Sequence, residues 1–358
     1  MRIRLPWLFA AFFLLTATMA SSQNLSVQPL NVVGSISPAD WEAYRSRFVE
    51  DNGRVVDTAN GNISHSEGQG YGLLLALAAG DRRSFEQIWN FTFTELLIRD
   101  DGLTAWKWDP ASKPRVTDRN NASDGDLLIA YALAKAGTTW QESRYTTAAR
   151  KLAQAIGKNT FSSSGRSLVL LPGAQGFGAG ERPDGPVVNL SYWVFEAFPM
   201  MAALAPEYEW SRVWRDGVML LQQATSGRVR LPADWLSLQN GLQPQPAGGF
   251  PPEFGYNSLR IPLYLLRAGM IDMEWLRALK QRWSAENEGV AVVNVQTGQI
   301  RERLTDQGYG ILPAALACAL DGTPVPEALR TFEPSLYYPS TLHLLAKSLL
   351  SEKYPQCV

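Results

Sequence analysis

Acidic residues in two segments have the type and setting for acid–base chemistry. Glu67 lies in HSEGQGYGLLL, just before a predicted helix whose first turn contains three glycines. Asp124 and Asp126 lie in ASDGDLLIAYALAKAGTTW, at the start of an amphipathic helix. A carboxyl group can act as a general acid or base when its surroundings adjust its pKa. These three residues are therefore the first candidates for a catalytic site.

Both segments also fit a purely structural role. Ser66 and Glu67 could cap the helix that follows them, and aspartate is favoured at helix starts, where the helix dipole stabilises its charge. Because Asp124 and Asp126 are two residues apart, they point in different directions, so one can cap while the other faces a site. Each glycine in the first segment costs about 1 kcal/mol of helix stability relative to alanine. Something must approach that backbone closely, and a sugar ring is one candidate.

Length and composition predict one globular domain. The 358 residues are 46% hydrophobic and 11% aromatic, which is enough for a single large core, and no Pro/Ser-rich linker interrupts the interior. We expect residues 23–358 to form this domain. Without Arg2 and Arg4, 33 − 2 = 31 basic residues face 34 acidic ones, a net charge of −3. The positive charges are scattered, so we expect no nucleic-acid partner and favour a neutral polymer.

The amino terminus has the features of a signal peptide. Arg2 and Arg4 precede an apolar run over 5–15, and small residues follow up to Ala20 and Ser22. The apolar run is shorter than the roughly 20 residues that cross a bilayer, so a membrane anchor is the less favoured alternative. We expect residues 1–22 to be removed by cleavage near Ala20 and the mature chain to be periplasmic or extracellular.

Cysteine and histidine are scarce. Export would permit a disulfide between Cys318, in an apolar run, and Cys357, near the carboxyl terminus, but the sequence does not establish this pairing. The histidines, His65 and His343, are far apart and suggest no Cys/His metal site. We expect neither a metal nor another cofactor.

Helical periodicity dominates the chain. In residues 81–97, for example, Phe85, Trp89, Phe93 and Leu96 fall on one face. The predicted helices are 39–49, 68–79, 81–97, 124–137, 142–157, 189–204, 209–224, 258–268, 272–285, 306–320, 324–331 and 337–352; the predicted strands are 168–171 and 290–295. Stacked helical hairpins form an open solenoid or a closed toroid, and a solenoid would show a sequence repeat. None is visible, so we predict an all-α fold, a closed α/α barrel whose long loops surround one cleft.

The acidic segments together resemble the signature of glycoside hydrolase family 8. SEGQGYG is similar to the block that carries the proton donor of that family, and ASDGDLLIAYALAKAGTTW is similar to its second block. The resemblance continues, in the expected order, through GLTAWKW (102–108), LVLLPG (168–173), LPADW (231–235), FGYNSLRIPLYL (254–265), TDQGYGILPAA (305–315) and YYPSTLHLLA (337–346). Among relatives, the chain looks most like endoglucanases that accompany bacterial cellulose synthesis.

The resemblance implies an (α/α)6 barrel, a six-hairpin toroid with an open groove for a β-glucan chain, and an inverting endo-β-1,4-glucanase activity. It implies that Glu67 is the general acid, with a pKa raised by Asp124 and by a water-poor cleft. Asp124 matches the aspartate that holds the sugar at the cleavage subsite. We expect a monomer, and the resemblance leaves open an association with a cellulose synthase complex.

Further residues are expected to bind substrate. Several aromatic side chains fall in loops or at helix starts rather than on apolar stripes, and pyranose rings stack on such faces. Arg260 lies one helical turn after Asn257 and should face the same site. The predicted substrate-binding residues are Trp106, Tyr192, Trp235, Tyr256, Arg260 and Tyr338.

One position departs from the family pattern. The general base of the family is an aspartate at the position of Asn257, and an amide cannot take a proton from water. Glu253, four residues earlier, and Asp124 are the candidates for a relocated base. The alternatives are a glycan-binding family 8 barrel that has lost its base, an enzyme for chitosan, xylan or mixed-linkage glucan, and an unrelated helical barrel enzyme such as a lyase.

Overall fold

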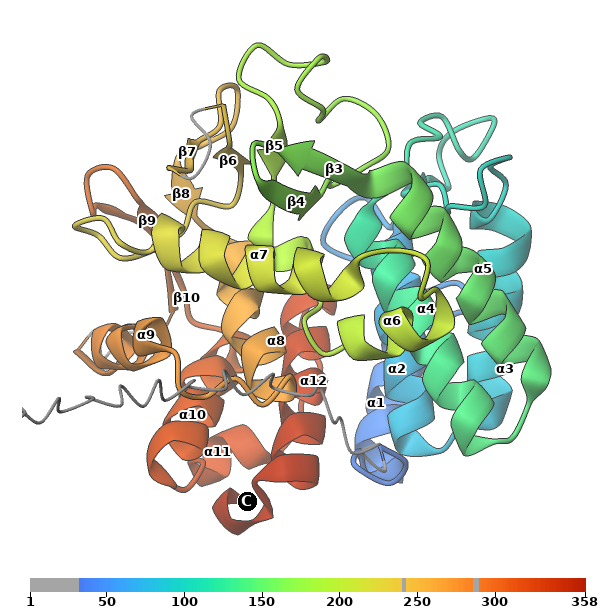
Figure 1. Cartoon of the computed structure of the whole chain (residues 1–358). Helices are drawn as coiled ribbons and strands as arrows, with labels where there is room; N and C mark the ends of the chain where they lie inside the picture. The colour runs from blue at the N-terminus through green and yellow to red at the C-terminus, as the bar shows by residue number, and fades with distance from the viewer. Residues whose placement is uncertain (1–31, 240–242, 286–289) are drawn as a thin grey trace, which may run out of the picture.

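The structure is a computed structural model that describes residues 32–239, 243–285 and 290–358 (Figure 1). The predicted signal peptide, residues 1–22, lies outside these ranges. Among the described residues, none of the helices combines the length and the apolar character needed to span a bilayer.

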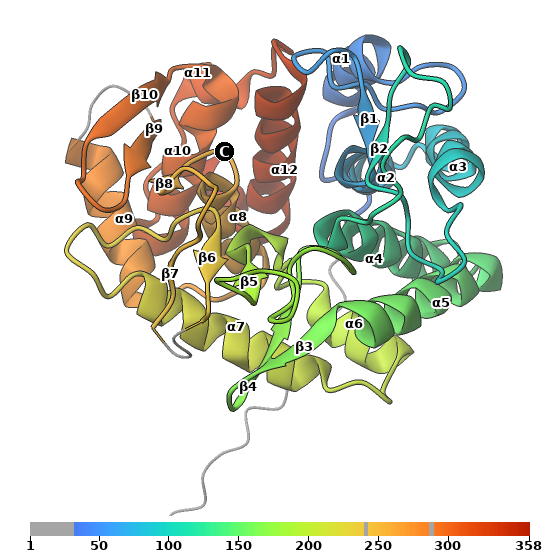
Figure 2. The ribbon, with the colours of Figure 1, turned by 90° about the horizontal axis from the view of Figure 1, so that it is seen from above.

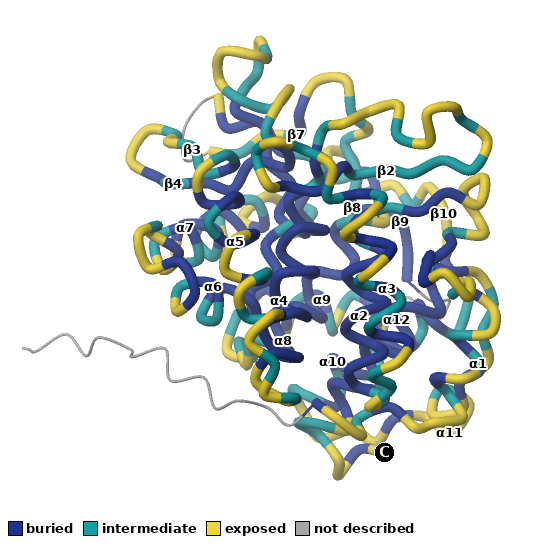
Figure 3. Tube along the Cα trace, turned by 90° about the vertical axis from the view of Figure 1, so that its right-hand side faces the viewer, coloured by how far each residue is buried: buried dark blue, intermediate teal, exposed yellow. Residues whose placement is uncertain are grey.

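The helices of the described chain fall into an inner and an outer set. The inner helices are α2 (Ser66–Ala79), α4 (Ser123–Thr139), α6 (Phe198–Leu204), α8 (Ile261–Arg267), α10 (Gln307–Asp321) and α12 (Tyr337–Lys353). The outer helices are α1 (Pro38–Phe48), α3 (Arg82–Phe91), α5 (Ser143–Thr160), α7 (Trp210–Ala224), α9 (Glu274–Ala285) and α11 (Glu327–Arg330). Helices α2, α4, α8 and α12 are buried around almost their whole circumference (Figure 3), which requires protein on every side.

The ring of helices is closed. Helix α12 contacts α2, so the last inner helix meets the first, and the view from above shows the inner helices surrounded by the outer ones (Figure 2). The fold is therefore an (α/α)6 barrel, as predicted.

Short strands join the loops at one end of this barrel, the upper end in Figure 1. They form four antiparallel sheets, β1–β2, β3–β4, β5–β6–β7 and β8–β9–β10. Their bounds are β1 Ser64–His65, β2 Lys107–Trp108, β3 Phe161–Ser164, β4 Ser167–Leu170, β5 Val187–Val188, β6 Leu236–Ser237, β7 Gln245–Pro246, β8 Glu253–Phe254, β9 Val290–Asn294 and β10 Ile300–Leu304. The predicted strands 168–171 and 290–295 correspond to β4 and β9. Most others have only two residues, too few for a recognisable alternation.

Two predicted helices are shorter than expected. The segment 189–204 contains a 3₁₀ turn, Leu190–Tyr192, and only then α6. The Asn189 side chain caps the start of this turn, because it accepts bonds from the Ser191 nitrogen and hydroxyl. The segment 324–331 is helical only over Glu327–Arg330, since Pro326 precedes the first helical residue.

The helix predicted over 81–97 changes its geometry at Thr92. Residues Thr92–Leu96 form a π-helical turn, in which the Thr92 hydroxyl donates to the Ile88 carbonyl and accepts from the Gln69 amide. The wider turn shifts the phase of the residues that follow it. Of the residues predicted on one face, Phe85 is buried, whereas Phe93 is 56% exposed and contacts the Trp89 ring.

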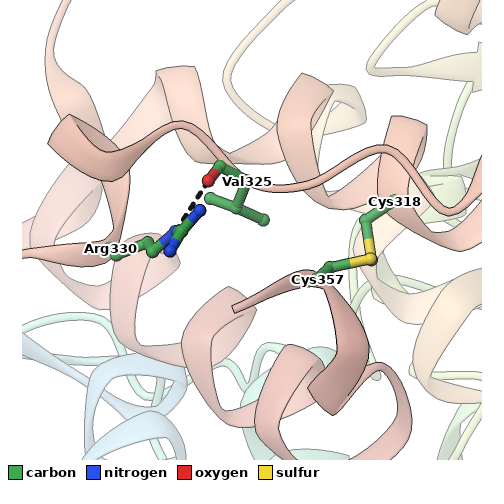
Figure 4. Close-up of a disulfide and its surroundings, with 4 residues drawn as sticks. All are labelled: Cys318, Val325, Arg330 and Cys357. Atoms are coloured by element: carbon green, nitrogen blue, oxygen red, sulfur yellow. Dashed lines mark hydrogen bonds between the residues drawn. A yellow bond between two sulfur atoms is a disulfide. The ribbon is translucent and has the colours of Figure 1, made fainter.

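The two cysteines form a disulfide, the pairing that the sequence left open. Cys318 on α10 and Cys357 in the final 3₁₀ turn, Pro355–Cys357, have Cα atoms 6.1 Å apart (Figure 4). The Val325 nitrogen donates to the Cys357 carbonyl, and Arg330 Nε donates to the Val325 carbonyl. The end of the chain is thereby fixed to an inner helix.

Candidate active site

The starts of α2 and α4 lie against each other because glycines leave room for the contact. A Cβ on Gly125 would lie 2.7 Å from the Glu67 nitrogen, and a Cβ on Gly70 would lie 2.5 Å from Cβ of Leu128. Both distances are too short for any side chain. The first turns of the two inner helices, and the acids they carry, are therefore neighbours.

This arrangement also explains the glycines of SEGQGYG. Besides Gly70, Gly68 faces the His65 ring and the Tyr337 hydroxyl, while Gly72 faces Val55 and Ile88. Protein atoms, rather than a sugar ring, occupy the space beside each of these glycines. The close approach expected from the sequence is thus helix packing.

Arg260 joins Glu67 to Asp124. Its Nη1 is 2.9 Å from Glu67 Oε1 and its Nη2 is 2.7 Å from Asp124 Oδ2. Arg260 ends a 3₁₀ turn, Ser258–Arg260, that leads into α8, so three inner helices contribute to this cluster. The Glu67 side chain is 18% exposed and that of Asp124 1% exposed. Of the two acids, Glu67 is the one a ligand can reach.

The two carboxyl groups titrate as a pair. Burial and the charge of Glu67 raise the pKa of Asp124 to about 7. Burial also raises the pKa of Glu67, but the charges of Arg260 and His65 outweigh it and hold the net pKa below its ordinary value. The sequence predicted a raised pKa for Glu67, whereas in the free protein the pKa of Asp124 is the one that is raised. Because the groups interact strongly, the proton belongs to the pair.

None of the residues considered as helix caps, Ser66, Glu67, Asp124 and Asp126, has this role. The cap of α2 is His65, whose Nδ1 accepts a 2.9 Å bond from the Gly68 nitrogen. Asp126 accepts bonds from the backbone and hydroxyl of Thr104 and from the Asn121 amide, and so fixes the loop before α4. Asp124 accepts from the adjacent Gly125 nitrogen and from Arg260, not as an N-cap.

Asn257 is bound to Asp234, a buried carboxylate that the sequence analysis did not select although it lies in the LPADW block. Asp234 Oδ1 accepts from the Gly255 and Ser258 nitrogens at 2.9 Å. Its Oδ2 accepts from the backbone and side-chain nitrogens of Asn257 at 3.3 Å. Asp234 thus holds the turn that carries Asn257 and leads to Arg260. Both carboxylate oxygens of Asp234 accept hydrogen bonds from this turn.

Glu253 lies next to the same turn. Its strand, β8, pairs with β9, and its carbonyl accepts a bond from the Asp234 nitrogen. A Cβ on Gly255 would be 3.3 Å from Glu253 Oε1, so the carboxyl group lies over the start of the turn. Burial and the neighbouring charge of Asp234 raise the pKa of Glu253. Among the described residues, no backbone N–H group donates to this carboxyl group, unlike that of Asp234.

Tyr192 and Trp235 lie beside the carboxylate cluster. The Arg260 guanidinium is 5.8 Å from the Tyr192 ring, and Tyr192 meets Trp235 edge to face at 6.0 Å. Trp235 also stacks on Phe250 and Phe177, with centroids 4.5 Å and 5.7 Å away. Two protein rings therefore already stack on Trp235, which was predicted to bind substrate.

Tyr256 and Tyr338 form a second aromatic group, and Trp106 lies in a separate loop. Tyr256 is 41% exposed and its hydroxyl donates to Glu302 on β10, while the Tyr338 hydroxyl donates to the Tyr256 carbonyl. Trp106 is half-buried, and its indole nitrogen donates to Asp118. Tyr256 thus presents its ring to solvent in a fixed orientation.

A cavity of about 490 Å³ lies away from these acids, lined by Gln222, Thr225, Ser226, Arg230, Met273, Glu274 and Trp275. None of the residues that line this cavity is a predicted catalytic or substrate-binding residue, and none of them contacts Glu67. In the described part of the chain, no group of three His, Cys, Asp or Glu side chains is placed to hold a metal ion.

Comparison with known proteins identifies the family of this chain. The sequence profile of "Glycosyl hydrolases family 8" matches residues 13–349. A probable endoglucanase of Novacetimonas hansenii is 38% identical over 68% of this chain and 71% of its own. An endoglucanase of Cellulomonas uda is 39% identical over 63% of this chain and 62% of its own, so that match spans less than two thirds of the relative.

Solved structures extend the similarity to nearly the whole chain. The endo-β-1,4-glucanase CMCax from Acetobacter xylinum superposes with a TM-score of 0.79 and 34% identity, over 91% of this chain and 99% of the other. The endoglucanase Cel10 from Klebsiella pneumoniae has a TM-score of 0.77 and 33% identity, over 86% and 97%. This chain therefore belongs to glycosyl hydrolase family 8, and the first inner helices of its barrel bring Glu67 and Asp124 to one arginine.

Proposed function

We propose that this glycoside hydrolase is an exported, inverting endo-β-1,4-glucanase that cuts internal bonds of cellulose or a similar glucan. The Glu67–Arg260–Asp124 bridge carries this proposal, because it places one accessible and one buried carboxyl group around a shared proton. The names of similar proteins, endoglucanase and endo-β-1,4-glucanase, support the substrate class.

Glu67 donates the proton to the leaving oxygen in this proposal. In the free protein the pair keeps one proton to about pH 7, the pKa of Asp124. A glycosidic oxygen at Glu67 favours the tautomer in which Glu67 holds that proton. Asp124 then becomes the charged partner of Arg260, close to the sugar that gains positive charge in the transition state.

An inverting reaction needs a second carboxylate that activates water from the opposite face of the sugar. Glu253 is our choice. Asp234 has both oxygens occupied by the turn around Asn257, and Asp124 is almost fully buried against Arg260. Glu253 is partly exposed, and its raised pKa makes its carboxylate a stronger base. The Asn257 side chain, oriented by Asp234, can position a water without deprotonating it.

The disulfide supports export. Disulfides persist in oxidising compartments and are rare in the bacterial cytosol. The Cys318–Cys357 bond therefore agrees with the signal peptide expected over residues 1–22. Mass spectrometry of the native exported protein should find an amino terminus between Ser21 and Asn24, and an intact Met1 in a membrane fraction would contradict the proposal. We expect a monomer, which size-exclusion chromatography can measure.

The test of function is incubation with carboxymethylcellulose, lichenan, xylan and chitosan in parallel. Release of reducing ends, with a rapid fall in the viscosity of carboxymethylcellulose, is expected of an endoglucanase. Proton NMR of the first product anomer distinguishes inversion, which yields the α-anomer from a β-bond, from retention. Preferential cleavage of xylan or chitosan would replace the proposed substrate.

A glycan-binding barrel without activity is the second candidate, and Asn257 is the observation that favours it. Such a protein would bind cellulose oligosaccharides in calorimetry and release no reducing ends from any of the four polysaccharides.

A further inference from the structure

His65 caps the helix that carries Glu67 through a ring nitrogen. Its backbone is extended, and its Nδ1 accepts a 2.9 Å bond from the Gly68 nitrogen, one residue after Glu67. A nitrogen that accepts a hydrogen bond carries no proton, so the neutral ring holds its proton on Nε2. Nε2 in turn lies 3.5 Å from Asp57 Oδ2.

The surroundings fix the ring in this orientation. A Cβ on Gly68 would lie 3.2 Å from His65 Cε1 and 2.9 Å from the Tyr337 hydroxyl, so only glycine fits beneath the imidazole. The Tyr337 ring meets His65 edge to face, with centroids 5.6 Å apart. Asp57, Gly68 and Tyr337 therefore contact different parts of one ring.

We propose that His65 is a positioning residue for the proton donor: its neutral ring holds the first turn of α2, with Glu67 directed at Arg260, and protonation of the ring releases that turn. This inference rests on the proposed role of Glu67 as the general acid. His65 is neither one of the proposed acid–base residues nor one of the predicted substrate-binding residues.

The chemical reason is that an imidazolium has no acceptor. Once Nδ1 gains a proton, it opposes the Gly68 N–H group, and the cap is lost. The cation would also lie beside Glu67, where a positive charge favours the ionised carboxylate and weakens a proton donor. Both effects act in the same direction, so activity requires the neutral ring.

The charged groups around His65 favour its protonation. They are Asp57 from the loop before β1, Glu67 on α2 and Asp124 on α4, and Tyr337 on α12 adds a titratable hydroxyl. Burial lowers the pKa of His65, but the bond to Asp57 and the charges of these acids outweigh it and raise the net value. The acid limb of the pH profile of kcat/KM should therefore follow His65.

NMR tests the inference directly, because the chain contains only two histidines, His65 and His343. The ¹⁵N shifts of the imidazoles, assigned with His343→Gln, report the tautomer and the pKa of His65 in the full-length mature protein. We expect the Nε2–H tautomer at high pH and a titration midpoint that coincides with the acid limb of kcat/KM. An Nδ1–H tautomer would overturn the proposal.

Variants separate positioning from mere stability. His65→Asn keeps an acceptor for the Gly68 nitrogen without titrating, so its acid limb should move to lower pH while kcat at the pH optimum stays within about threefold of the wild type. His65→Ala lacks the acceptor and should lose about 10-fold to 100-fold in kcat with little change in KM. Asp57→Asn lowers the pKa of His65, so the NMR midpoint and the acid limb should fall together.

An acid limb that stays in place while the NMR midpoint moves would overturn the inference. So would equal losses of kcat in His65→Asn and His65→Ala, provided that circular dichroism shows both folded. A wild-type chain that hydrolyses none of the polysaccharides would instead remove the proposed function. The tautomer and the shift in Asp57→Asn would then still decide whether His65 caps α2 as described.

Discussion

Gly125 on α4 lies directly against the backbone of Glu67 on α2, since a Cβ on Gly125 would be only 2.7 Å from the Glu67 nitrogen. The two helices therefore start side by side, and Glu67 and Asp124 reach the same guanidinium. A glycine that touches no substrate thus determines the separation of the two carboxyl groups.

Gly125→Ala should consequently impair both the fold and the site. The added methyl group must push α4 away from α2, at a cost of about 1–3 kcal/mol of unfolding free energy. We expect a lower Tm and, in the folded fraction, a loss of kcat larger than that of binding affinity. Gly310→Ala is the matched control, because a Cβ on this helical glycine meets its nearest side-chain atom, Leu329 Cδ2, at an ordinary 3.5 Å. Equal effects in both variants would contradict the role of Gly125.

Glu67→Gln should retain the fold and oligosaccharide binding and lose about 10³-fold in hydrolysis, because an amide cannot donate the required proton. Reducing-end assays and calorimetry with a cellulose oligosaccharide measure the two properties separately. Glu327→Gln, an exposed substitution on α11, should leave both unchanged. Near wild-type turnover in Glu67→Gln would remove the assignment of Glu67 as general acid.

Arg260→Gln should make stability fall as pH rises. Without the guanidinium, both carboxyl groups have folded-state pKa values above their unfolded ones, so stability is retained below the unfolded values and lost as the groups ionise. The loss should be small near pH 4 and reach about 3–5 kcal/mol near pH 8. Thermal unfolding of this variant and the wild type from pH 4 to 8 measures it. A pH-independent difference would argue against a buried ion pair.

The barrel and its acids could be predicted because their signals are local. Inner helices such as α4 are apolar on nearly every face, and the blocks around Glu67 and Asp124 are contiguous in sequence. Arg260 was placed beside them in the same way, and its predicted contact with substrate stays a prediction. The π turn at Thr92 could not be predicted, because it depends on a bond from Gln69, more than 20 residues away.

The missed residues act over long separations or through unusual chemistry. Asp234 accepts from nitrogens 21 to 24 residues further along the chain, and no local pattern encodes that contact. His65 was overlooked as a cap because Ser, Thr, Asp and Asn are the common N-caps. Trp235 was predicted to bind substrate, and the sequence did not indicate that Phe177 and Phe250, from two other loops, stack on it.

The disulfide should stabilise the fold without affecting catalysis. Cys318 and Cys357 are 39 residues apart, and the carboxyl terminus that follows Cys357 lies at the lower end of the barrel in Figure 1, opposite the loops. A paired Cys318→Ser and Cys357→Ser variant should lose about 2–4 kcal/mol of unfolding free energy. Its kcat and KM at 25 °C should match those of the wild type. A large change in kcat would show that the carboxyl-terminal anchor also shapes the site.

The identity of the base gives the most demanding prediction. Glu253→Gln should lower kcat by about 10²-fold to 10⁴-fold, the usual contribution of a general base, while Glu67 can still donate its proton. Asn257→Asp should change the rate only modestly, because Glu253 already supplies the carboxylate. Reducing-end assays on the folded variants, with Glu327→Gln as control, measure these effects.

The alternative predicts the opposite response at Asn257. If the barrel only binds glycan, the wild type is inactive, and Asn257→Asp creates hydrolysis where there was none, because it places a carboxylate beside Asp234. Asp124→Asn tests whether Asp124 is the general base. If Asp124→Asn is inactive while Glu253→Gln is fully active, the general base is Asp124 and not Glu253. Activity that survives both Glu253→Gln and Asp124→Asn would exclude both acids. The water would then be activated by a carboxylate outside this turn and outside the Arg260 cluster.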